Sequence, residues 1–175
     1  RATDPYILAT YFNTKESDAG SETFPETLAA IDYVLTHPPE SDDAWALNLR
    51  GNVRMEQGRP EAALADYRAA VARGGIFHGN LAQALLAAGR RDEALQYTRE
   101  MLARADVTPA SRVDFGLVLL KDGDVRGAAD VAHQMASRSQ EPQIVWRGQA
   151  LLVGTLNYAH RPAEALKVIE EYEQV

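Results

Sequence analysis

A chain of 175 residues with 46% hydrophobic and 25% charged residues has the composition of a folded globular protein, not of a disordered segment. No apolar run reaches the roughly 18 residues that a membrane-spanning helix needs, so we expect no membrane insertion. The chain contains no cysteine, which excludes disulfides and thiolate metal sites. This absence fits the cytoplasm and the periplasm equally well, and the localisation stays open.

The net charge of −7 is concentrated in residues 1–43, which hold nine acidic residues against Arg1 and Lys15. The rest of the chain holds sixteen acidic and sixteen basic residues and is neutral. Because no basic stripe is present to neutralise phosphates, we do not expect nucleic acid as a partner. An acidic region can steer a basic partner, although a polar loop with acidic helix N-termini accounts for the same residues.

Two helices are predicted in the N-terminal part of the chain. The first covers residues 4–12 and the second covers residues 23–37, where Pro25 suits the first turn. Residues 13–22 between them are polar and contain glycine, which is typical of a loop. We interpret residues 1–41 as a degenerate repeat: a helical pair with an acidic polar loop, packed against the unit that follows.

From residue 42 onward the chain repeats a turn followed by a helix that carries an alanine at a fixed place. The steps between these alanines are 31, 34 and 37 residues, and a period in this range is typical of helical solenoids. We therefore predict four units, at about 42–74, 75–107, 108–140 and 141–175. The alanines are Ala63, Ala94, Ala128 and Ala165.

The turn inside each unit carries signals for the end of one helix and the start of the next. Glycine occupies this turn in three units, where it can adopt the left-handed conformation that ends a helix, and His160 replaces it in the fourth. Thr108 can cap the first helix of the third unit. Small residues are expected where the two helices of a pair touch, although Val153 stands at this position in the fourth unit. The expected pairs are Gly51 with Ala63, Ala82 with Ala94, and Gly116 with Ala128.

These features resemble the tetratricopeptide repeat (TPR) family, whose pattern has a small residue in the first helix, glycine at the turn, and alanine, leucine and an aromatic residue in the second helix. The resemblance covers about three-quarters of the chain. It implies an all-α fold: a right-handed superhelical solenoid of antiparallel helix pairs, with about four repeats and the N-terminal pair. The first unit matches best, through Leu47, Gly51, Gly58, Ala63, Leu64, Tyr67 and Ala70.

The motifs of common enzyme classes are absent from the sequence. There is no phosphate-binding loop, no G-x-S-x-G nucleophile elbow, no H-E-x-x-H zinc motif and no G-x-G-x-x-G dinucleotide fingerprint. The four histidines fall in different units without metal-ligand spacing. We therefore expect a chain that is not an enzyme and that uses neither a cofactor nor a metal.

The resemblance also implies a concave groove, lined by the first helix of each unit, that binds an extended or helical segment. Amide side chains in this groove suit a peptide backbone, and amide and aromatic groups also suit a neutral polysaccharide. For the leucines, the alternative is that they fill the core between units. The groove residues implied are Trp45, Asn48, Asn52 and Met55, then Ile76, Gln83 and Leu86, then Val113, Leu117, Leu120 and Lys121, and finally Arg147, Asn157 and Tyr158.

The expected function is a non-catalytic protein–protein interaction scaffold that binds a peptide segment of a partner, as part of a larger bacterial assembly or secretion protein. Fifteen arginines against three lysines indicate a GC-rich bacterial genome. Two alternatives stay open: a regulatory TPR appendage of an enzyme whose catalytic domain lies outside this chain, and a polysaccharide-binding module of an export system.

The C-terminal helix is predicted to leave an apolar edge, formed by Val168, Ile169, Tyr172 and Val175, without a polar helix to cover it. Solenoids usually need such a cap. We expect that the natural protein continues beyond Val175; the alternative is that this edge contacts a partner or self-associates with a second copy.

Overall fold

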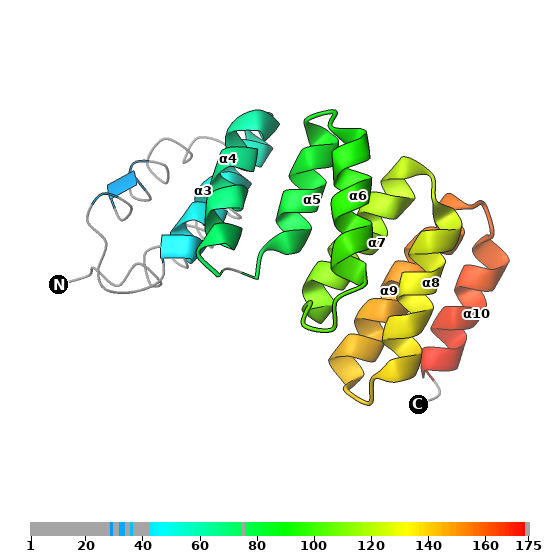
Figure 1. The fold of residues 1–175 in the computed structure, drawn as a ribbon. Helices are drawn as coiled ribbons and strands as arrows, with labels where there is room; N and C mark the ends of the chain where they lie inside the picture. Colours follow the sequence, from blue (N-terminus) through cyan, green and yellow to red (C-terminus); the bar gives the residue numbers. More distant parts are fainter. Residues whose placement is uncertain (1–28, 30–31, 34–35, 37–42, 75, 174–175) are drawn as a thin grey trace. The chain divides into compact units, whose positions relative to one another are not determined.

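The computed structural model describes residues 29, 32–33, 36, 43–74 and 76–173 (Figure 1). This part of the chain is entirely helical, with no strand, which confirms the all-α prediction. The predicted helix over 4–12 lies outside the described residues, and the described residues of the predicted helix over 23–37 are helical. The helices are α3 (Asp43–Glu56), α4 (Pro60–Ala72), α5 (His78–Ala87), α6 (Arg91–Leu102), α7 (Pro109–Asp122), α8 (Val125–Arg138), α9 (Pro142–Tyr158) and α10 (Pro162–Glu173).

The chain divides into two compact units, Arg1–Ala84 and Leu85–Val175, with the boundary inside α5. Each of the four predicted repeat spans holds two helices joined by a short turn. The repeat alanines lie on the second helix of each span and are almost fully buried, at 0% exposure for the first three and 3% for Ala165. Their burial follows from the need for close helix packing at this position.

The helix ends follow the signals in the sequence. At the start of α7 the Thr108 hydroxyl accepts a hydrogen bond from the Ser111 backbone N–H (3.2 Å), as an N-cap should. The same helix ends at Gly123, whose φ of 92° is left-handed. His160, which replaces the turn glycine in the fourth span, also adopts a left-handed φ of 56°. The turn geometry is therefore kept there even though the side chain carries a steric cost.

In the first unit, α3 and α4 pack along their length. Gly51 lies directly under the ring of Tyr67: a β-carbon added at this glycine would stand 2.5 Å from Tyr67 Cε1. The atoms nearest to this β-carbon position belong to Tyr67, a neighbour that the predicted pairing of Gly51 with Ala63 did not include. The aromatic ring needs the space that the missing side chain leaves.

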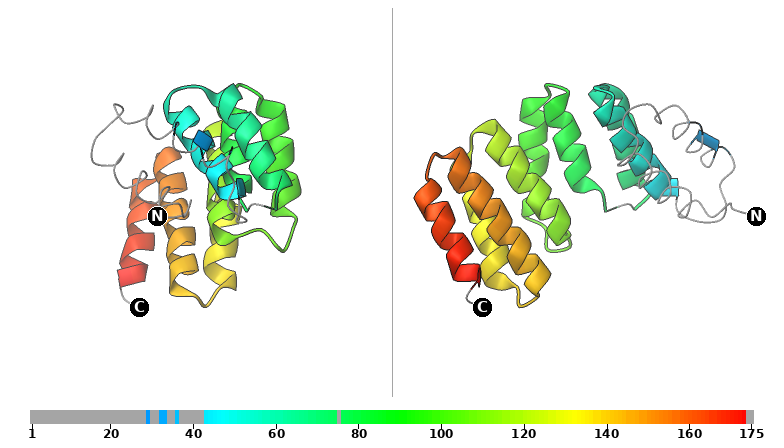
Figure 2. Two further views of the ribbon diagram at one scale, coloured as in Figure 1. Left: turned by 90° about the vertical axis from the view of Figure 1, so that its left-hand side faces the viewer. Right: turned by 180° about the vertical axis from the view of Figure 1, so that it is seen from behind.

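In the second unit, α7 packs against both α8 and α9, and α9 also packs against α10 (Figure 2). A β-carbon added at Gly116 would meet the side chain of Leu151 on α9, so this glycine also makes room for a helix outside its own pair. A second close approach occurs at Gly148, where an added β-carbon would stand 2.8 Å from the Ala136 nitrogen on α8. The backbones of α8 and α9 therefore approach closely at a position that the repeat pattern did not single out.

This close approach predicts opposite effects for alanine at two glycines of the same helix. Gly148→Ala forces the α8 backbone to move and should lower the free energy of unfolding by roughly 1–3 kcal/mol. Gly154 is exposed and has no atom within 4 Å of an added β-carbon, so Gly154→Ala should stabilise the helix by roughly 0.5–1 kcal/mol. Urea unfolding followed by far-UV circular dichroism measures both values. Equal effects at the two positions would contradict the packing of α8 against α9.

Candidate functional site

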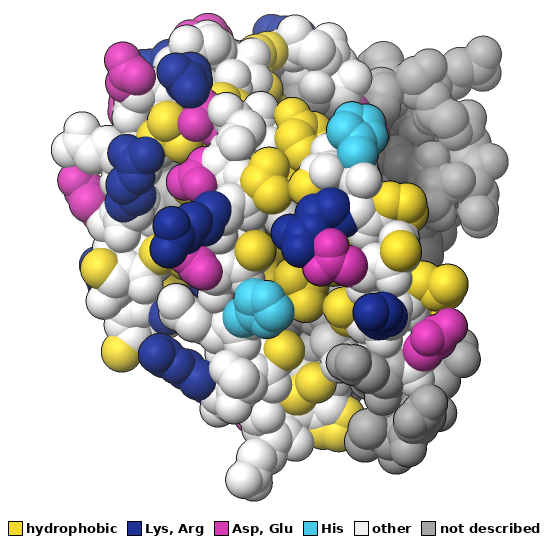
Figure 3. Space-filling view, turned by 90° about the vertical axis from the view of Figure 1, so that its right-hand side faces the viewer, with side chains coloured by type: hydrophobic (Ala, Val, Ile, Leu, Met, Phe, Trp, Pro, Cys, Tyr) yellow, Lys and Arg dark blue, Asp and Glu magenta, His cyan; other side chains and the backbone are white. Residues whose placement is uncertain are grey.

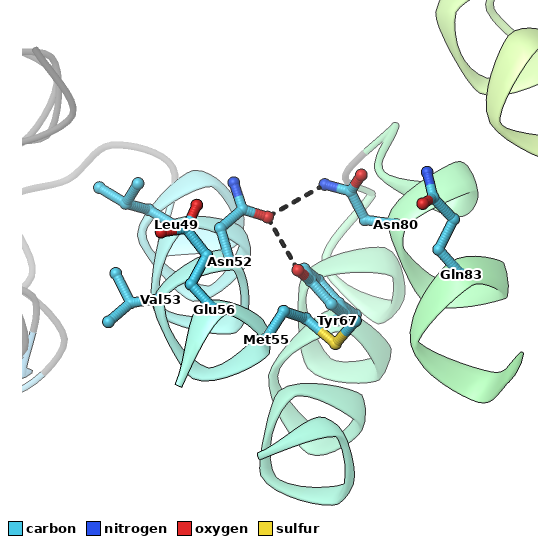
Figure 4. A pocket seen from close by; sticks show the side chains of 8 residues that line it. All are labelled: Leu49, Asn52, Val53, Met55, Glu56, Tyr67, Asn80 and Gln83. Carbon is cyan, nitrogen blue, oxygen red and sulfur yellow. Dashed lines mark hydrogen bonds between the residues drawn. The ribbon is translucent and has the colours of Figure 1, made fainter. Parts of the chain in front are cut away.

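The first unit carries a pocket of about 240 Å³ at the meeting point of α3, α4 and α5 (Figure 4). We call it the amide pocket because three of its side chains are carboxamides. Most of its wall comes from one face of α3, and α4 and α5 close the other side. The lining residues are Leu49, Asn52, Val53, Met55, Glu56, Tyr67, Asn80 and Gln83.

A hydrogen-bond network links the three helices around the Asn52 side chain. The Tyr67 hydroxyl donates to Asn52 Oδ1 (2.8 Å), and Asn80 Nδ2 donates to the same oxygen (3.4 Å). Asn80 Nδ2 also donates to Asn48 Oδ1 (2.7 Å) one helical turn away. Since each bond joins two different helices, the network fixes the amide of Asn52 in one orientation.

This orientation turns the Asn52 amide nitrogen away from Tyr67 and Asn80 (Figure 4). No hydrogen bond within the described part of the chain uses that nitrogen. An amide nitrogen carries two N–H donors and no acceptor. The group that Asn52 offers to a ligand is therefore a donor, and it suits a carbonyl oxygen.

The remaining lining residues add an acceptor and an apolar wall. Glu56 is exposed and follows Asn52 by four residues, so the two side chains share one face of α3. Its carboxylate can accept hydrogen bonds from N–H groups. Met55 is half-buried and supplies apolar surface beside these polar groups, whereas Leu49 and Val53 border the pocket but are almost fully buried, at 3% and 2% exposure. The pocket thus presents a donor, an acceptor and apolar surface, which are the groups that a polypeptide segment needs.

A partly buried ion-pair cluster around Asp66 links α3 to α4 in the same unit. The Asp66 side chain is 3% exposed and accepts from Arg50 Nη2 (2.8 Å) and from Arg54 Nη1 (2.6 Å). Arg50 Nη1 also donates to Asp32 Oδ1 (2.6 Å). Burial lowers the pKa of Arg50, but its hydrogen bonds with Asp66 and Asp32 outweigh this effect and raise the pKa above its usual value.

The predicted groove residues of the first unit differ in their accessibility. Asn52, Met55 and Gln83 line the amide pocket. Asn48 is buried at 7% exposure, with its oxygen occupied by Asn80, so it supports the pocket instead of lining it. Trp45 is half-buried and Ile76 is exposed, and neither lines this pocket.

Sequence reasoning missed five lining residues: Leu49, Val53, Glu56, Tyr67 and Asn80. Asn80 precedes Gln83 by three residues on α5, and this spacing places both on one helix face. Glu56 stands four residues after Asn52, which is the same kind of signal. Tyr67 was assigned to the core of the repeat, and its ring is buried there; only the hydroxyl reaches Asn52.

In the second unit the predicted residues do not gather into one pocket. Leu86, Val113 and Leu117 are half-buried, Leu120 is buried, and Lys121, Asn157 and Tyr158 are exposed. Arg147 lines a pocket of about 310 Å³ together with Trp146, which the sequence analysis did not single out. The other residues of that pocket are Pro142 and Gln143.

The C-terminal edge exposes apolar side chains, with Leu166 at 54% and Ile169 at 42% exposure. Figure 3 shows this side of the molecule, where hydrophobic surface lies among charged side chains of both signs. Val168 and Ile169 line a pocket of about 280 Å³ that also includes Trp146. The Tyr172 side chain and Val175 lie outside the described residues.

Within the described ranges no helix is both long and apolar enough to span a bilayer. The same ranges contain no group of three or more His, Asp or Glu side chains that could hold a metal ion.

Comparison with known proteins does not assign the chain to a family. No protein-family model matches the sequence, and no curated protein is significantly similar to it. The geometry of the amide pocket and its supporting cluster is therefore the basis on which a function can be proposed.

The Asp66 cluster predicts a large loss of stability when its charge is removed. Asp66→Asn leaves two arginines without their buried carboxylate, and breaking such a buried pair costs roughly 3–5 kcal/mol of unfolding free energy. Asp130→Asn on the exposed face of α8 is the matched control and should stay within roughly 0.5 kcal/mol of the wild type. Urea unfolding of the two variants measures the difference. A variant at Asp66 as stable as the control would show that the cluster does not hold α3 to α4.

Proposed function

We propose that the chain is a non-catalytic interaction module that holds a peptide segment of a partner protein in the amide pocket. The observation that carries this proposal is the fixed orientation of Asn52, whose oxygen is used by Tyr67 and Asn80 while its nitrogen stays available for a ligand. A peptide backbone offers carbonyl oxygens to this donor and N–H groups to the Glu56 carboxylate.

The neighbouring apolar residues give the pocket a basis for selecting among peptides. Met55 is an adaptable side chain that fits ligands of differing shape, and Val53 and Leu49 border the pocket. The pocket volume of about 240 Å³ is small, so a short segment with one apolar side chain is the ligand that fits best. We propose that this module is part of a larger bacterial assembly or secretion protein.

We also propose that the helix pairs form a right-handed solenoid of the TPR type. Two helices in each repeat span and the burial of the repeat alanines support this arrangement. In such a fold the first helix of each pair lines the binding face, and α3, which supplies most of the amide pocket, is a first helix. A regulatory TPR appendage of an enzyme would use the same pocket, so the binding experiment applies to both settings.

A second candidate ligand is a polysaccharide, and the surface around Trp146 favours it. This indole is 54% exposed and borders the pocket that contains Gln143 and Arg147. An exposed aromatic ring beside amide and guanidinium donors suits a sugar ring with its hydroxyl groups. Quenching of tryptophan fluorescence by a soluble glycan, lost in Trp146→Ala, would support this alternative over the peptide.

The peptide proposal predicts that one atom exchange in the pocket abolishes binding. A random peptide library displayed on phage is first selected against the immobilised protein, and the enriched peptide is measured by fluorescence polarisation. Asn52→Asp keeps an oxygen for Tyr67 and Asn80 but replaces the free N–H donor by an oxygen that repels a carbonyl. We expect binding at least tenfold weaker, which is about 1.4 kcal/mol.

Two matched controls separate this effect from a general change of charge. Asn157→Asp makes the same exchange on an exposed position of α9 and should leave the affinity within twofold. Gln83→Arg inside the pocket should weaken binding, whereas Gln96→Arg on the exposed face of α6 should not. If the selection enriches no peptide, or if both pocket variants bind as the wild type does, the proposal fails.

A further inference from the structure

The second unit carries a larger groove, which we call the basic groove. It is lined by residues of the α6–α7 loop and the α8–α9 turn, which lie at the same end of this unit in the ribbon (Figures 1 and 2). Its volume is about 490 Å³, within the range of roughly 300–1,000 Å³ that ligand pockets occupy. The residues that matter for its chemistry are Leu102, Arg104, Arg112, Met135, Arg138 and Ile144.

All charged residues that line this groove are positive, because its lining contains three arginines and no acidic residue. Arg104 is paired with Asp106 nearby, through an Nη2–Oδ2 distance of 2.6 Å. Arg112 and Arg138 form no ion pair within the described part of the chain. Two positive charges are therefore left for a ligand to neutralise.

The Arg112 side chain is held in place by backbone carbonyls, and no carboxylate of the described residues binds it. Its Nη2 donates to the Arg104 carbonyl (2.7 Å), and its Nη1 donates to the Leu102 carbonyl at 3.4 Å. Neutral carbonyls orient the guanidinium without cancelling its charge. Arginine has five N–H donors in a planar fork, so donors remain for a carboxylate.

The rest of the groove is apolar and lies beside the arginines. Met135 is buried at 5% exposure, and Leu102 and Ile144 are half-buried at the surface of the groove. A ligand that fills this space needs an apolar group next to its negative charge. A nucleic acid fits poorly, since two free arginines are too few for its phosphates and the apolar wall would stay uncovered.

We propose that the basic groove binds an acidic peptide segment, with carboxylates on Arg112 and Arg138 and an apolar side chain against Leu102 and Ile144. Arginine recognises carboxylates through paired hydrogen bonds, which gives such a contact both strength and orientation. This site is separate from the amide pocket and does not depend on the function proposed for it.

The test uses a fluorescein-labelled peptide with a repeated aspartate–leucine–glutamate sequence, measured by fluorescence polarisation against the full chain. The same peptide with asparagine and glutamine in place of the acids is the uncharged control. The acidic peptide should bind, its affinity should fall as sodium chloride is raised, and the uncharged peptide should bind at least tenfold more weakly.

Matched arginine variants then locate the site. Arg112→Gln with Arg138→Gln should weaken binding of the acidic peptide at least tenfold, as should the single charge reversal Arg138→Glu at the exposed end of α8. Arg99→Gln with Arg126→Gln removes two exposed arginines that do not line the groove and should leave the affinity within twofold. Far-UV circular dichroism verifies that each variant is folded.

Three results would overturn the proposal. The control pair could weaken binding as much as the groove pair, which would indicate attraction to the net surface charge. An oligothymidylate could bind as tightly as the acidic peptide, which would indicate an unselective anion site. Finally, Asn52→Asp could abolish binding of the acidic peptide, which would assign that peptide to the amide pocket.

Discussion

Close approach of helix backbones is the constraint on which this fold depends. The repeat alanines have almost no exposed surface, and Gly51 and Gly148 leave space that Tyr67 and the α8 backbone occupy. A larger side chain at such a position would overpack the contact at a cost of roughly 1–3 kcal/mol. Small residues therefore set the helix spacing, and the spacing decides which polar side chains on neighbouring helices can reach each other.

The amide pocket is a direct consequence of this spacing. Tyr67 reaches Asn52 because Gly51 leaves space for its ring close to α3, and Asn80 completes the contact from α5. A side chain that is already fixed loses little freedom when a ligand binds, so less of the interaction energy is spent on ordering it. The Asp66 cluster has a similar effect on the backbone, because it holds α3 to α4 through two arginines. Within the pocket, the hydrogen bonds thus fix Asn52, Tyr67 and Asn80, whereas Met55 contributes an adaptable side chain.

The sequence predicted those features that depend on neighbours along the chain. Thr108 caps α7 and Gly123 ends it, because capping and left-handed turns are set by a few consecutive residues. The alanine period predicted the helix pairs because the same short turn-and-helix sequence recurs in each unit. Contacts between helices of different pairs were harder to predict from the sequence. A β-carbon at Gly116, for example, would meet Leu151 on α9, a residue far along the chain.

Asn48 and Asn52 illustrate this limit within the site. Their spacing places both on one face of α3, and from the sequence they were equivalent candidates for a ligand. In the folded unit Asn80 covers Asn48 and leaves the nitrogen of Asn52 available. The two amides stand one helical turn apart, and they differ because Asn80 on α5 bonds mainly to Asn48. The repeat pattern does not predict the position of a single side chain on α5.

The two sites differ in the physical basis of recognition, and this difference matters for how a partner would be chosen. Neutral amides and apolar side chains make up the amide pocket, apart from Glu56, so hydrogen-bond geometry decides what fits and salt has little influence. Arginines supply the charge of the basic groove. Their electrostatic attraction extends over about 10 Å at 0.1 M salt and over shorter distances at higher salt. The groove can therefore attract an acidic segment from a distance, whereas the amide pocket can only select at contact. A partner that carries an acidic stretch and a separate neutral motif would use both properties, with charge raising the rate of encounter and the fixed amide of Asn52 discriminating among the segments that arrive.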